Sequence, residues 1–165
     1  MLLSPKRTRR VVVASILLAA ALTYKGSESL LGRYRIGFNA TESLSNWGYI
    51  IDRKNRAASL GNLIEFIPPP NDYYPPGASF VKKIAGMPGE EVERRGDVIF
   101  VGGREIGRVK ATDRNGKKAV PGPLGVIPEG SVFVAGDHPD SLDSRYAAIG
   151  FVETKQIIGV GEPIL

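Results

Sequence analysis

The sequence predicts a mainly β domain, an antiparallel, partly closed barrel of short strands, preceded by one N-terminal hydrophobic helix. Between residues 63 and 152, short runs of β-branched and aromatic residues alternate with Gly and Pro turns. Two of those turns have the composition of tight hairpins. No amphipathic helical pattern of ten or more residues follows Tyr24. The length of 165 residues is enough for one compact domain.

The first 24 residues predict a membrane-targeting segment. Residues 1–10 carry four cations and no acidic group, and residues 11–24 are almost entirely apolar. As a helix this run spans ~21 Å at ~1.5 Å per residue, which is short of the ~20 residues that usually cross a bilayer. A signal peptide cleaved near Ala21 and a short uncleaved signal anchor both stay open. Either places residues 1–10 in the cytoplasm and residues 25–165 in the periplasm, tethered to the bacterial inner membrane unless the segment is cleaved.

The remaining predicted elements are short strands that end at turn residues. Gly102-Gly103 and Asn115-Gly116 each separate two β-rich runs, because tight turns need residues that accept a positive φ. The expected strands are residues 63–67, 80–85, 97–101, 104–106, 109–112, 117–120, 131–135 and 149–152.

Composition excludes several classes of function. Of the formal charge of +5, four charges lie in residues 1–10, and residues 11–165 hold 18 basic and 17 acidic groups, so the body is nearly neutral and no nucleic-acid partner is predicted. The absence of cysteine excludes thiolate catalysis and disulfides. His138 is the only histidine, which excludes a two-histidine metal site.

Residues 80–85 contain a candidate catalytic lysine. Strand alternation places Phe80, Lys82 and Ile84 on one face, with Lys83 on the other. A lysine among bulky apolar neighbours is a candidate for a desolvated amine, which can accept a proton from a serine hydroxyl. The alternative is that both lysines are solvated charges on an edge strand.

Two further segments carry polar groups in turns. Ser43 lies in one, before residues 47–51, whose aromatic and apolar side chains either rest at the membrane surface or pack in the core. Residues 136–146 form the other. Their three aspartates permit a cation loop, His138 permits a Ser-His-Asp triad, and Asp143 and Arg145 are suited to pair with each other.

Taken together, these segments resemble type I signal (leader) peptidases. Residues 80–90, Phe-Val-Lys-Lys-Ile-Ala-Gly-Met-Pro-Gly-Glu, resemble the lysine box of that family. Residues 136–146 resemble its Gly-Asp…Ser-x-Asp-Ser-Arg-Tyr box, and Ser43-Leu44 resembles its serine box. Residues 61–66 are similar to the strand before the lysine box. The boxes follow the family's order, and the resemblance covers about residues 11–153.

Within the family, the chain looks most like the TraF branch, the peptidases of conjugative transfer. Residues 39–44 and the pair His138-Pro139 before Ser141 carry this resemblance. The chain also departs from the family, which places a proline shortly after the nucleophile, because residues 44–48 contain none. The departure leaves Ser45 open as an alternative nucleophile.

The resemblance implies a Ser-Lys mechanism that needs no metal or cofactor. Ser43 is then the nucleophile, Lys82 the general base, and Ser141 the hydroxyl that orients the lysine amine. The remaining implied site residues are an ion pair that fixes the loop and two oxyanion-hole donors: Asp143 with Arg145, and the Thr41 hydroxyl with the backbone N–H of Ser43.

The function that follows is a serine endopeptidase of the signal peptidase type that matures exported proteins at the membrane. The expected substrate is a pilin precursor of a conjugative or type IV secretion apparatus, released by water or, as a cyclic product, by its own amine. A general type I signal peptidase is the alternative within the class. A catalytically inactive, membrane-tethered β-domain for assembly is the alternative from another class.

Overall fold

The computed structural model describes residues 15–16, 31–38, 43–46, 48–113 and 115–164. The chain divides into two units, Met1–Tyr34 and Arg35–Leu165, and the second holds nearly all the strands. In chain order the elements are β1 (Tyr34–Phe38), β2 (Gly48–Asp52), β3 (Leu63–Phe66), β4 (Phe80–Gly86), β5 (Glu91–Arg95), β6 (Val98–Val101), β7 (Arg104–Arg108), β8 (Gly125–Val126), β9 (Ser131–Ala135), β10 (Val152–Glu153), the 3-10 helix η1 (Thr154–Gln156) and β11 (Ile157–Pro163).

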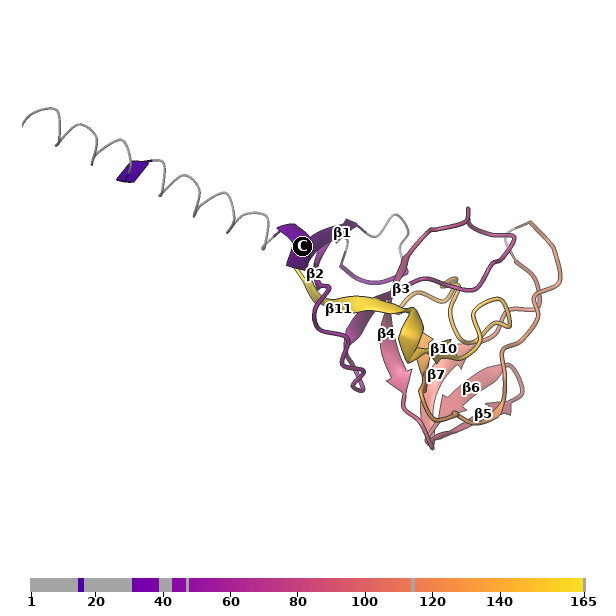
Figure 1. Cartoon of the computed structure of the whole chain (residues 1–165). Helices are drawn as coiled ribbons and strands as arrows, with labels where there is room; N and C mark the ends of the chain where they lie inside the picture. The colour runs from indigo at the N-terminus through magenta and orange to yellow at the C-terminus, as the bar shows by residue number, and fades with distance from the viewer. Residues whose placement is uncertain (1–14, 17–30, 39–42, 47, 114, 165) are drawn as a thin grey trace, which may run out of the picture. The chain divides into compact units, whose positions relative to one another are not determined.

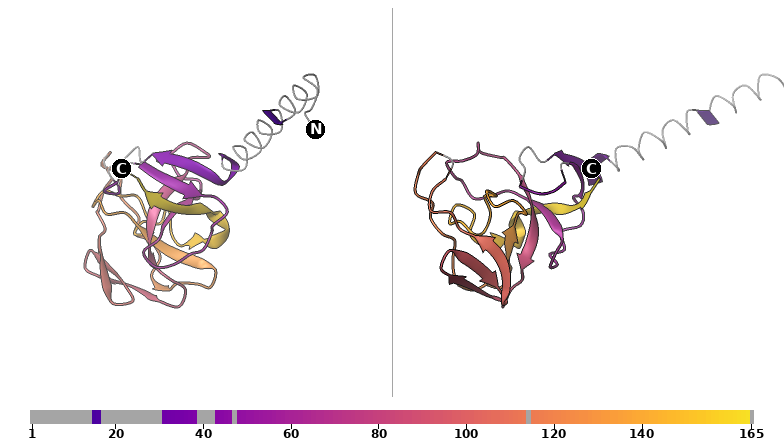
Figure 2. Two further views of the ribbon diagram at one scale, coloured as in Figure 1. Left: turned by 90° about the vertical axis from the view of Figure 1, so that its left-hand side faces the viewer. Right: turned by 180° about the vertical axis from the view of Figure 1, so that it is seen from behind.

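The strands form two antiparallel sheets (Figure 1). The larger has the order β1-β2-β11-β3-β4-β9-β10, and the smaller has the order β7-β6-β5-β8. The C-terminal strand β11 pairs with β2 on one side and β3 on the other. Early and late parts of the chain therefore share the larger sheet, as the two further views show (Figure 2).

The prediction of a mainly antiparallel β domain is confirmed, whereas the partly closed barrel is wrong. The described strands form two open sheets, and β1 and β10 lie at opposite ends of the larger one. The sheet is open because its two edge strands, β1 and β10, are not paired with each other, and β11 lies in its interior between β2 and β3. The predicted helix over residues 11–24 lies outside the described residues, apart from 15–16. Among the described residues, no helix combines the length and apolar character needed to span a bilayer.

Most of the predicted strands are present at nearly the predicted bounds. Gly102 and Gly103 turn between β6 and β7 with φ values of 52° and 77°, the left-handed region that this tight turn requires. Residues 109–120 differ from prediction, because an isolated bridge from Thr112 to Lys118 replaces two full strands. The strands β1, β5, β8 and β11 were not predicted, and the predicted strand over residues 149–152 shares only Val152 with β10.

The core under the larger sheet fixes the orientation of β4. Ile64, Phe66, Phe80 and Ile84 are buried in one cluster, together with side chains of β9 to β11. A second cluster lies against the smaller sheet and includes Phe133 from β9. The central strand β4 therefore has one face in the core, and a residue between Phe80 and Ile84 on that face is sheltered from water.

The residues after Ser43 also pack in the core. Tyr49 and Ile51 on β2 are fully buried in a third cluster with Leu44. Of the two readings of this segment, core packing is therefore correct for both side chains, and Ile50 between them is exposed.

Candidate active site

Lys82 is buried on the core-facing side of β4. Its side chain lies between Phe80 and Ile84 in the strand alternation, and the residue is only 4% exposed. Burial lowers the pKa of Lys82 to about 8; the charge of Asp143 opposes this shift, and that of Arg145 adds to it. A lysine with this pKa holds a much larger neutral fraction near pH 7 than an exposed lysine, whose pKa is about 10.4.

Lys83, by contrast, is a half-exposed cation with a carboxylate partner. Its ammonium lies 3.2 Å from Oδ1 of Asp137. Asp137 also accepts the backbone N–H of Ser45 through Oδ2, at 3.3 Å. Burial alone would raise the pKa of Asp137, but the contacts with Lys83 and Ser45 lower it overall. Of the two adjacent lysines, Lys82 is therefore the desolvated one.

Ser43 lies in the turn before β2, and its backbone is hydrogen-bonded to the loop that follows β9. Its carbonyl oxygen accepts the backbone N–H of Asp137 at 2.8 Å and that of His138 at 3.3 Å. The residue is buried, at 7% exposure. Two hydrogen bonds to one carbonyl fix the backbone at Ser43, because its position is then set by a second segment of the chain.

Gly136 allows these two segments to approach each other. A Cβ at this position would lie 2.5 Å from the Ser43 carbonyl oxygen and 2.2 Å from Oγ of Ser141. Neither distance is compatible with a side chain, so only glycine fits between the two serines.

Ser141 presents a buried hydroxyl at the same place. The residue is 2% exposed, and its Oγ has no hydrogen-bond partner among the described residues, Lys82 included. A buried hydroxyl without a partner costs stability, of order 1–3 kcal/mol. Such groups mark sites where a ligand or a moving side chain completes the hydrogen bond.

The loop that carries Ser141 is held by a buried ion pair. Arg145 donates from Nε to Oδ1 of Asp143 at 2.9 Å and from Nη2 to Oδ2 at 2.8 Å. The same carboxylate accepts the N–H of Gly136 at 2.9 Å. Burial by itself would lower the pKa of Arg145, but the hydrogen bonds with Asp143 raise it overall.

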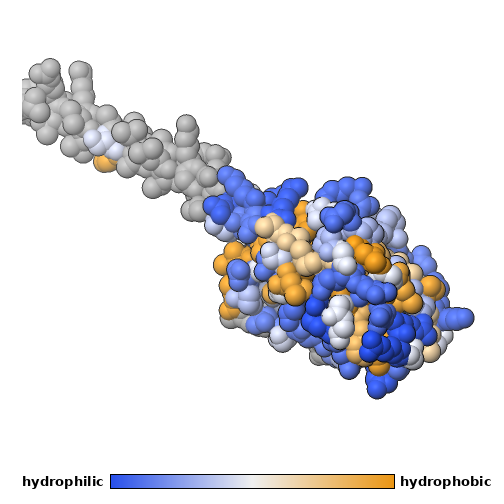
Figure 3. Space-filling view, turned by 90° about the horizontal axis from the view of Figure 1, so that it is seen from below, coloured by the Kyte–Doolittle hydropathy of each residue, from blue (hydrophilic) through white to orange (hydrophobic). Residues whose placement is uncertain are grey.

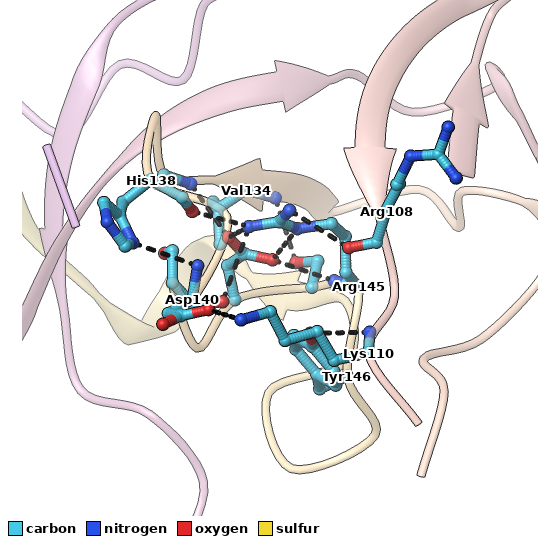
Figure 4. Close-up of polar contacts among 11 residues, drawn as sticks. Arg108, Lys110, Val134, His138, Asp140, Arg145 and Tyr146 are labelled. Carbon is cyan, nitrogen blue, oxygen red and sulfur yellow. Dashed lines mark hydrogen bonds and ion pairs between the residues drawn. The ribbon is translucent and has the colours of Figure 1, made fainter. Parts of the chain in front are cut away.

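Further contacts of Arg145 tie the loop together. Its guanidinium donates to the carbonyl oxygens of Arg108 and His138, both at 3.3 Å, and of Ser141 at 3.4 Å (Figure 4). One side chain therefore connects the strand that ends at Arg108 with both ends of the turn before Ser141.

His138 is not arranged as a triad base. Its Nδ1 accepts the backbone N–H of Asp140 at 3.0 Å. In a Ser-His-Asp triad this nitrogen donates to a carboxylate instead. The cation loop is also not supported, because Asp137, Asp140 and Asp143 each pair with a different side chain, Lys83, Lys110 and Arg145.

Ser43, Lys82 and Ser141 line one cavity of about 810 Å³. Its walls also include residues of the segments 70–74 and 110–120, which were not predicted as parts of the site. The tyrosines at 73 and 74, between prolines, are the only sequence signal there. Ser45 is exposed and is not among the lining residues. Thr41 lies outside the described residues.

A buried lysine and two serine hydroxyls around one cavity define a candidate serine hydrolase site. The family model for "Signal peptidase, peptidase S26" matches residues 9–165. The chain therefore belongs to the S26 signal peptidase family, whose members are serine-type endopeptidases. The resemblance to type I signal peptidases is confirmed.

The chain is also similar to individual named proteins. Conjugal transfer protein TraF of Agrobacterium fabrum is 29% identical over 169 residues, covering 92% of this chain and 91% of that protein. Signal peptidase I of Bacillus licheniformis is 29% identical over 92 residues, covering 50% and 48% of the two chains. A crystal structure of a signal peptidase I from Enterococcus faecalis is 28% identical, covers 64% of this chain and 97% of that one, and superposes with a TM-score of 0.42.

Proposed function

We propose that this chain is a Ser-Lys endopeptidase that cleaves exported precursor proteins, with Ser43 as nucleophile and Lys82 as general base. The observation that carries the proposal is the buried Lys82 amine, which lines the same cavity as Ser43 and has a pKa of about 8. The shift from 10.5 corresponds to about 3 kcal/mol at ~1.4 kcal/mol per unit. About a tenth of the amine is then neutral at pH 7.

The proposed reaction moves one proton back and forth. As Ser43 Oγ attacks the scissile carbonyl, Lys82 Nζ takes the hydroxyl proton, and the carbonyl oxygen becomes an oxyanion. Lys82 then gives that proton to the leaving amine, and an acyl-enzyme ester forms on Ser43. Water or an amine attacks the ester, Lys82 accepts its proton, and the proton returns to Ser43 as the product leaves.

Supporting groups have separate proposed roles. Ser141 would orient the Lys82 amine through the hydroxyl that is unpartnered in this structure. The pair of Asp143 and Arg145 holds its loop. The backbone N–H of Ser43 and the hydroxyl of Thr41 are the proposed oxyanion donors, one such donor being worth roughly 3 kcal/mol.

The proposed substrate is a pilin precursor of a conjugative or type IV secretion apparatus. The similarity to a conjugal transfer protein over nine-tenths of both chains supports this choice over a general secretory substrate. Capture of the acyl-enzyme by the substrate's own amine would give a cyclic product lighter by one water than the hydrolysed one. Mass spectrometry of the product distinguishes the two outcomes.

The proposed location is the outer face of the bacterial inner membrane, or the periplasm if the N-terminal segment is cleaved. The four cations in residues 1–10 before an apolar run support it. Apolar side chains are also exposed on the folded body, among hydrophilic ones on the face in Figure 3. Those on β1 and β2 include Ile36, Phe38 and Ile50.

The test uses matched variants of the full-length chain with a precursor substrate. Ser43→Ala and Lys82→Ala should each abolish cleavage while circular dichroism shows an intact fold. Ser45→Ala should cleave normally, and Lys83→Ala should lose less than about tenfold, because Lys83 makes only an exposed ion pair. Cleavage by both Ser43→Ala and Lys82→Ala would overturn the proposal in favour of another nucleophile and base, whereas no cleavage by the unaltered, folded chain would overturn it in favour of the inactive assembly domain.

A further inference from the structure

The proline-rich loop between β3 and β4 places an aromatic side chain against Phe80, which shares the core-facing side of β4 with the proposed general base. Tyr74 in this loop is half-buried, packs against the core cluster that contains Phe80, and lines the active-site cavity. Tyr74 has no role in the proposed reaction itself. The inference below rests on the proposed function, in which Lys82 is the base.

The Phe80 ring lies between the Tyr74 ring and the amine of Lys82 in a series of contacts. The rings of Tyr74 and Phe80 meet edge to face, with centroids 4.6 Å apart and planes at 72°. The Lys82 Nζ lies 5.6 Å from the centroid of Phe80. Phe66 contacts Phe80 as well, with centroids 6.0 Å apart. Phe80 is therefore fixed between a core ring and a cavity-lining ring, in a geometry that aromatic pairs prefer.

The loop holds Tyr74 in place through an asparagine turn. Oδ1 of Asn71 accepts the backbone N–H of Tyr73 at 3.0 Å and that of Tyr74 at 3.2 Å. Its Nδ2 donates to the carbonyl oxygen of Pro69 at 2.9 Å. Prolines before and after this turn limit the conformations that the loop can adopt, so little entropy is lost when Tyr74 is ordered.

We propose that Tyr74 is a positioning residue for Lys82: its ring keeps Phe80 against the amine and keeps water away from that side of the cavity. The cavity is large enough to hold many water molecules, so a buried amine at its wall stays dry only where side chains cover it. Phe80 can supply that cover only while its ring is held in place. Tyr74 is the ring that holds it from the side of the cavity.

The charged groups around Lys82 do not depend on Tyr74. Asp143 and Asp137 favour the ammonium form and Arg145 disfavours it, but burial is the largest influence. Further ionisable side chains line the cavity: Asp72, Tyr73, Lys110, Asp113, Lys117, Lys118, His138, Asp140 and Tyr146. On β3, Glu65 is paired with Arg35. Loss of the Tyr74 ring therefore changes the hydration of Lys82 and leaves these charges in place.

The experiment measures the pKa of Lys82 directly in the full-length protein in detergent. The protein carries ¹³C-labelled lysine, the Cε signal of Lys82 is assigned with Lys82→Arg, and its chemical shift is followed with pH. Tyr74→Leu should raise the midpoint by about one pH unit, a fraction of the 3–5 units available from full burial. Tyr74→Phe keeps the ring and removes the phenol, and should leave the midpoint unchanged. Tyr73→Leu, a neighbour in the same loop, should also leave it unchanged.

The same variants are then assayed for precursor cleavage. In Tyr74→Leu the acid limb of kcat/KM should move up with the Lys82 midpoint, so that the rate falls about tenfold at pH 7 and recovers near pH 10. KM at high pH should be unchanged, since a loss of substrate contacts would raise it. Asn71→Ala, which releases the turn but keeps every ring, should shift both midpoints in the same direction by less.

Each result has a defined meaning. An unchanged Lys82 midpoint in folded Tyr74→Leu, or equal shifts in Tyr74→Phe or Tyr73→Leu, overturns the inference. A shifted Lys82 midpoint with an unshifted pH profile of the rate supports the inference that Tyr74 acts on Lys82 through Phe80. The same result overturns Lys82 as the base, and with it the proposed function. If Tyr74→Leu does not fold, Asn71→Ala decides, and an unchanged midpoint there overturns the inference.

Discussion

Replacing Asp143 with asparagine tests whether the buried ion pair organises the site. Asp143 is fully buried and Arg145 is 3% exposed, and two charged hydrogen bonds of 2.9 and 2.8 Å join them. Asp143→Asn keeps the shape but leaves the guanidinium without its counter-charge. Breaking a buried pair on one side costs about 3–5 kcal/mol, because the remaining charge stays desolvated. A loss of that size is a large fraction of the total stability of about 5–15 kcal/mol for a domain.

The chain contains a matched surface pair as a control. Arg108 donates to both carboxylate oxygens of Asp97, at 3.1 and 2.8 Å, but both side chains are exposed. Asp97→Asn should therefore leave the urea midpoint almost unchanged, since exposed pairs contribute little. The assay is equilibrium urea unfolding of the full-length chain in detergent, followed by tryptophan fluorescence at pH 7.

The double variant Asp143→Asn/Arg145→Gln separates the cost of leaving a buried charge uncompensated from the cost of losing the hydrogen bonds between the two side chains. It removes the uncompensated charge, so it should be more stable than Asp143→Asn alone. Equal losses in Asp143→Asn and Asp97→Asn would refute the argument, because burial would then have no bearing on the value of the pair. A double variant less stable than the single one would show that the charge of Arg145 is satisfied without Asp143.

Three further predictions concern the residues around the cavity. Gly136→Ala should abolish cleavage and lower stability by about 1–3 kcal/mol, because its Cβ meets Ser141 and Ser43; Gly32→Ala, which has open space around its Cβ, is the control in activity and unfolding assays. Lys82→Met should raise the unfolding free energy at pH 7 by up to about 3 kcal/mol and little near pH 11. The folded-state pKa of about 8 lies below the unfolded value, so the buried lysine destabilises the fold below pH 8 and this penalty disappears as the pH rises to about 10.5. The kcat/KM of the unaltered chain should fall about tenfold per unit below pH 8, and a flat profile from pH 6 to 8 would contradict a lysine base.

The strand that carries Lys82 could be predicted from sequence because its pattern is local. On β4 the buried positions alternate with more exposed ones, and Phe80, Lys82 and Ile84 share the core face. The hairpin at Gly102 and Gly103 could be predicted for the same reason, since a tight turn selects its own residues. Both features depend on neighbours within a few positions of the chain.

The order of the strands could not be predicted, because it depends on contacts between distant segments. β11 contains Gly159 and Gly161 and ends at Pro163. Because glycine and proline have low strand propensity, the sequence does not indicate a strand here. The structure shows why Gly159 is required: a Cβ there would lie 2.5 Å from the carbonyl oxygen of Asp52 on β2. The close approach of β11 to β2 therefore selects the glycine that makes this strand hard to predict from its own sequence.

The arrangement around the cavity explains why the proposed site draws on four separate segments. Burial of the Lys82 amine costs about 3 kcal/mol of folding free energy at pH 7. The packing of the core cluster around β4 offsets this cost. The adjacent loop contributes rigidity, through the Asp143–Arg145 pair and the bonds to the Ser43 carbonyl. Lys82 lies on a strand, whereas Ser43 and Ser141 lie on loops that the hydrogen bonds of the Ser43 carbonyl tie to each other. The contact that the proposed mechanism still requires is the hydrogen bond between Ser141 Oγ and the Lys82 amine, and both groups line the same cavity.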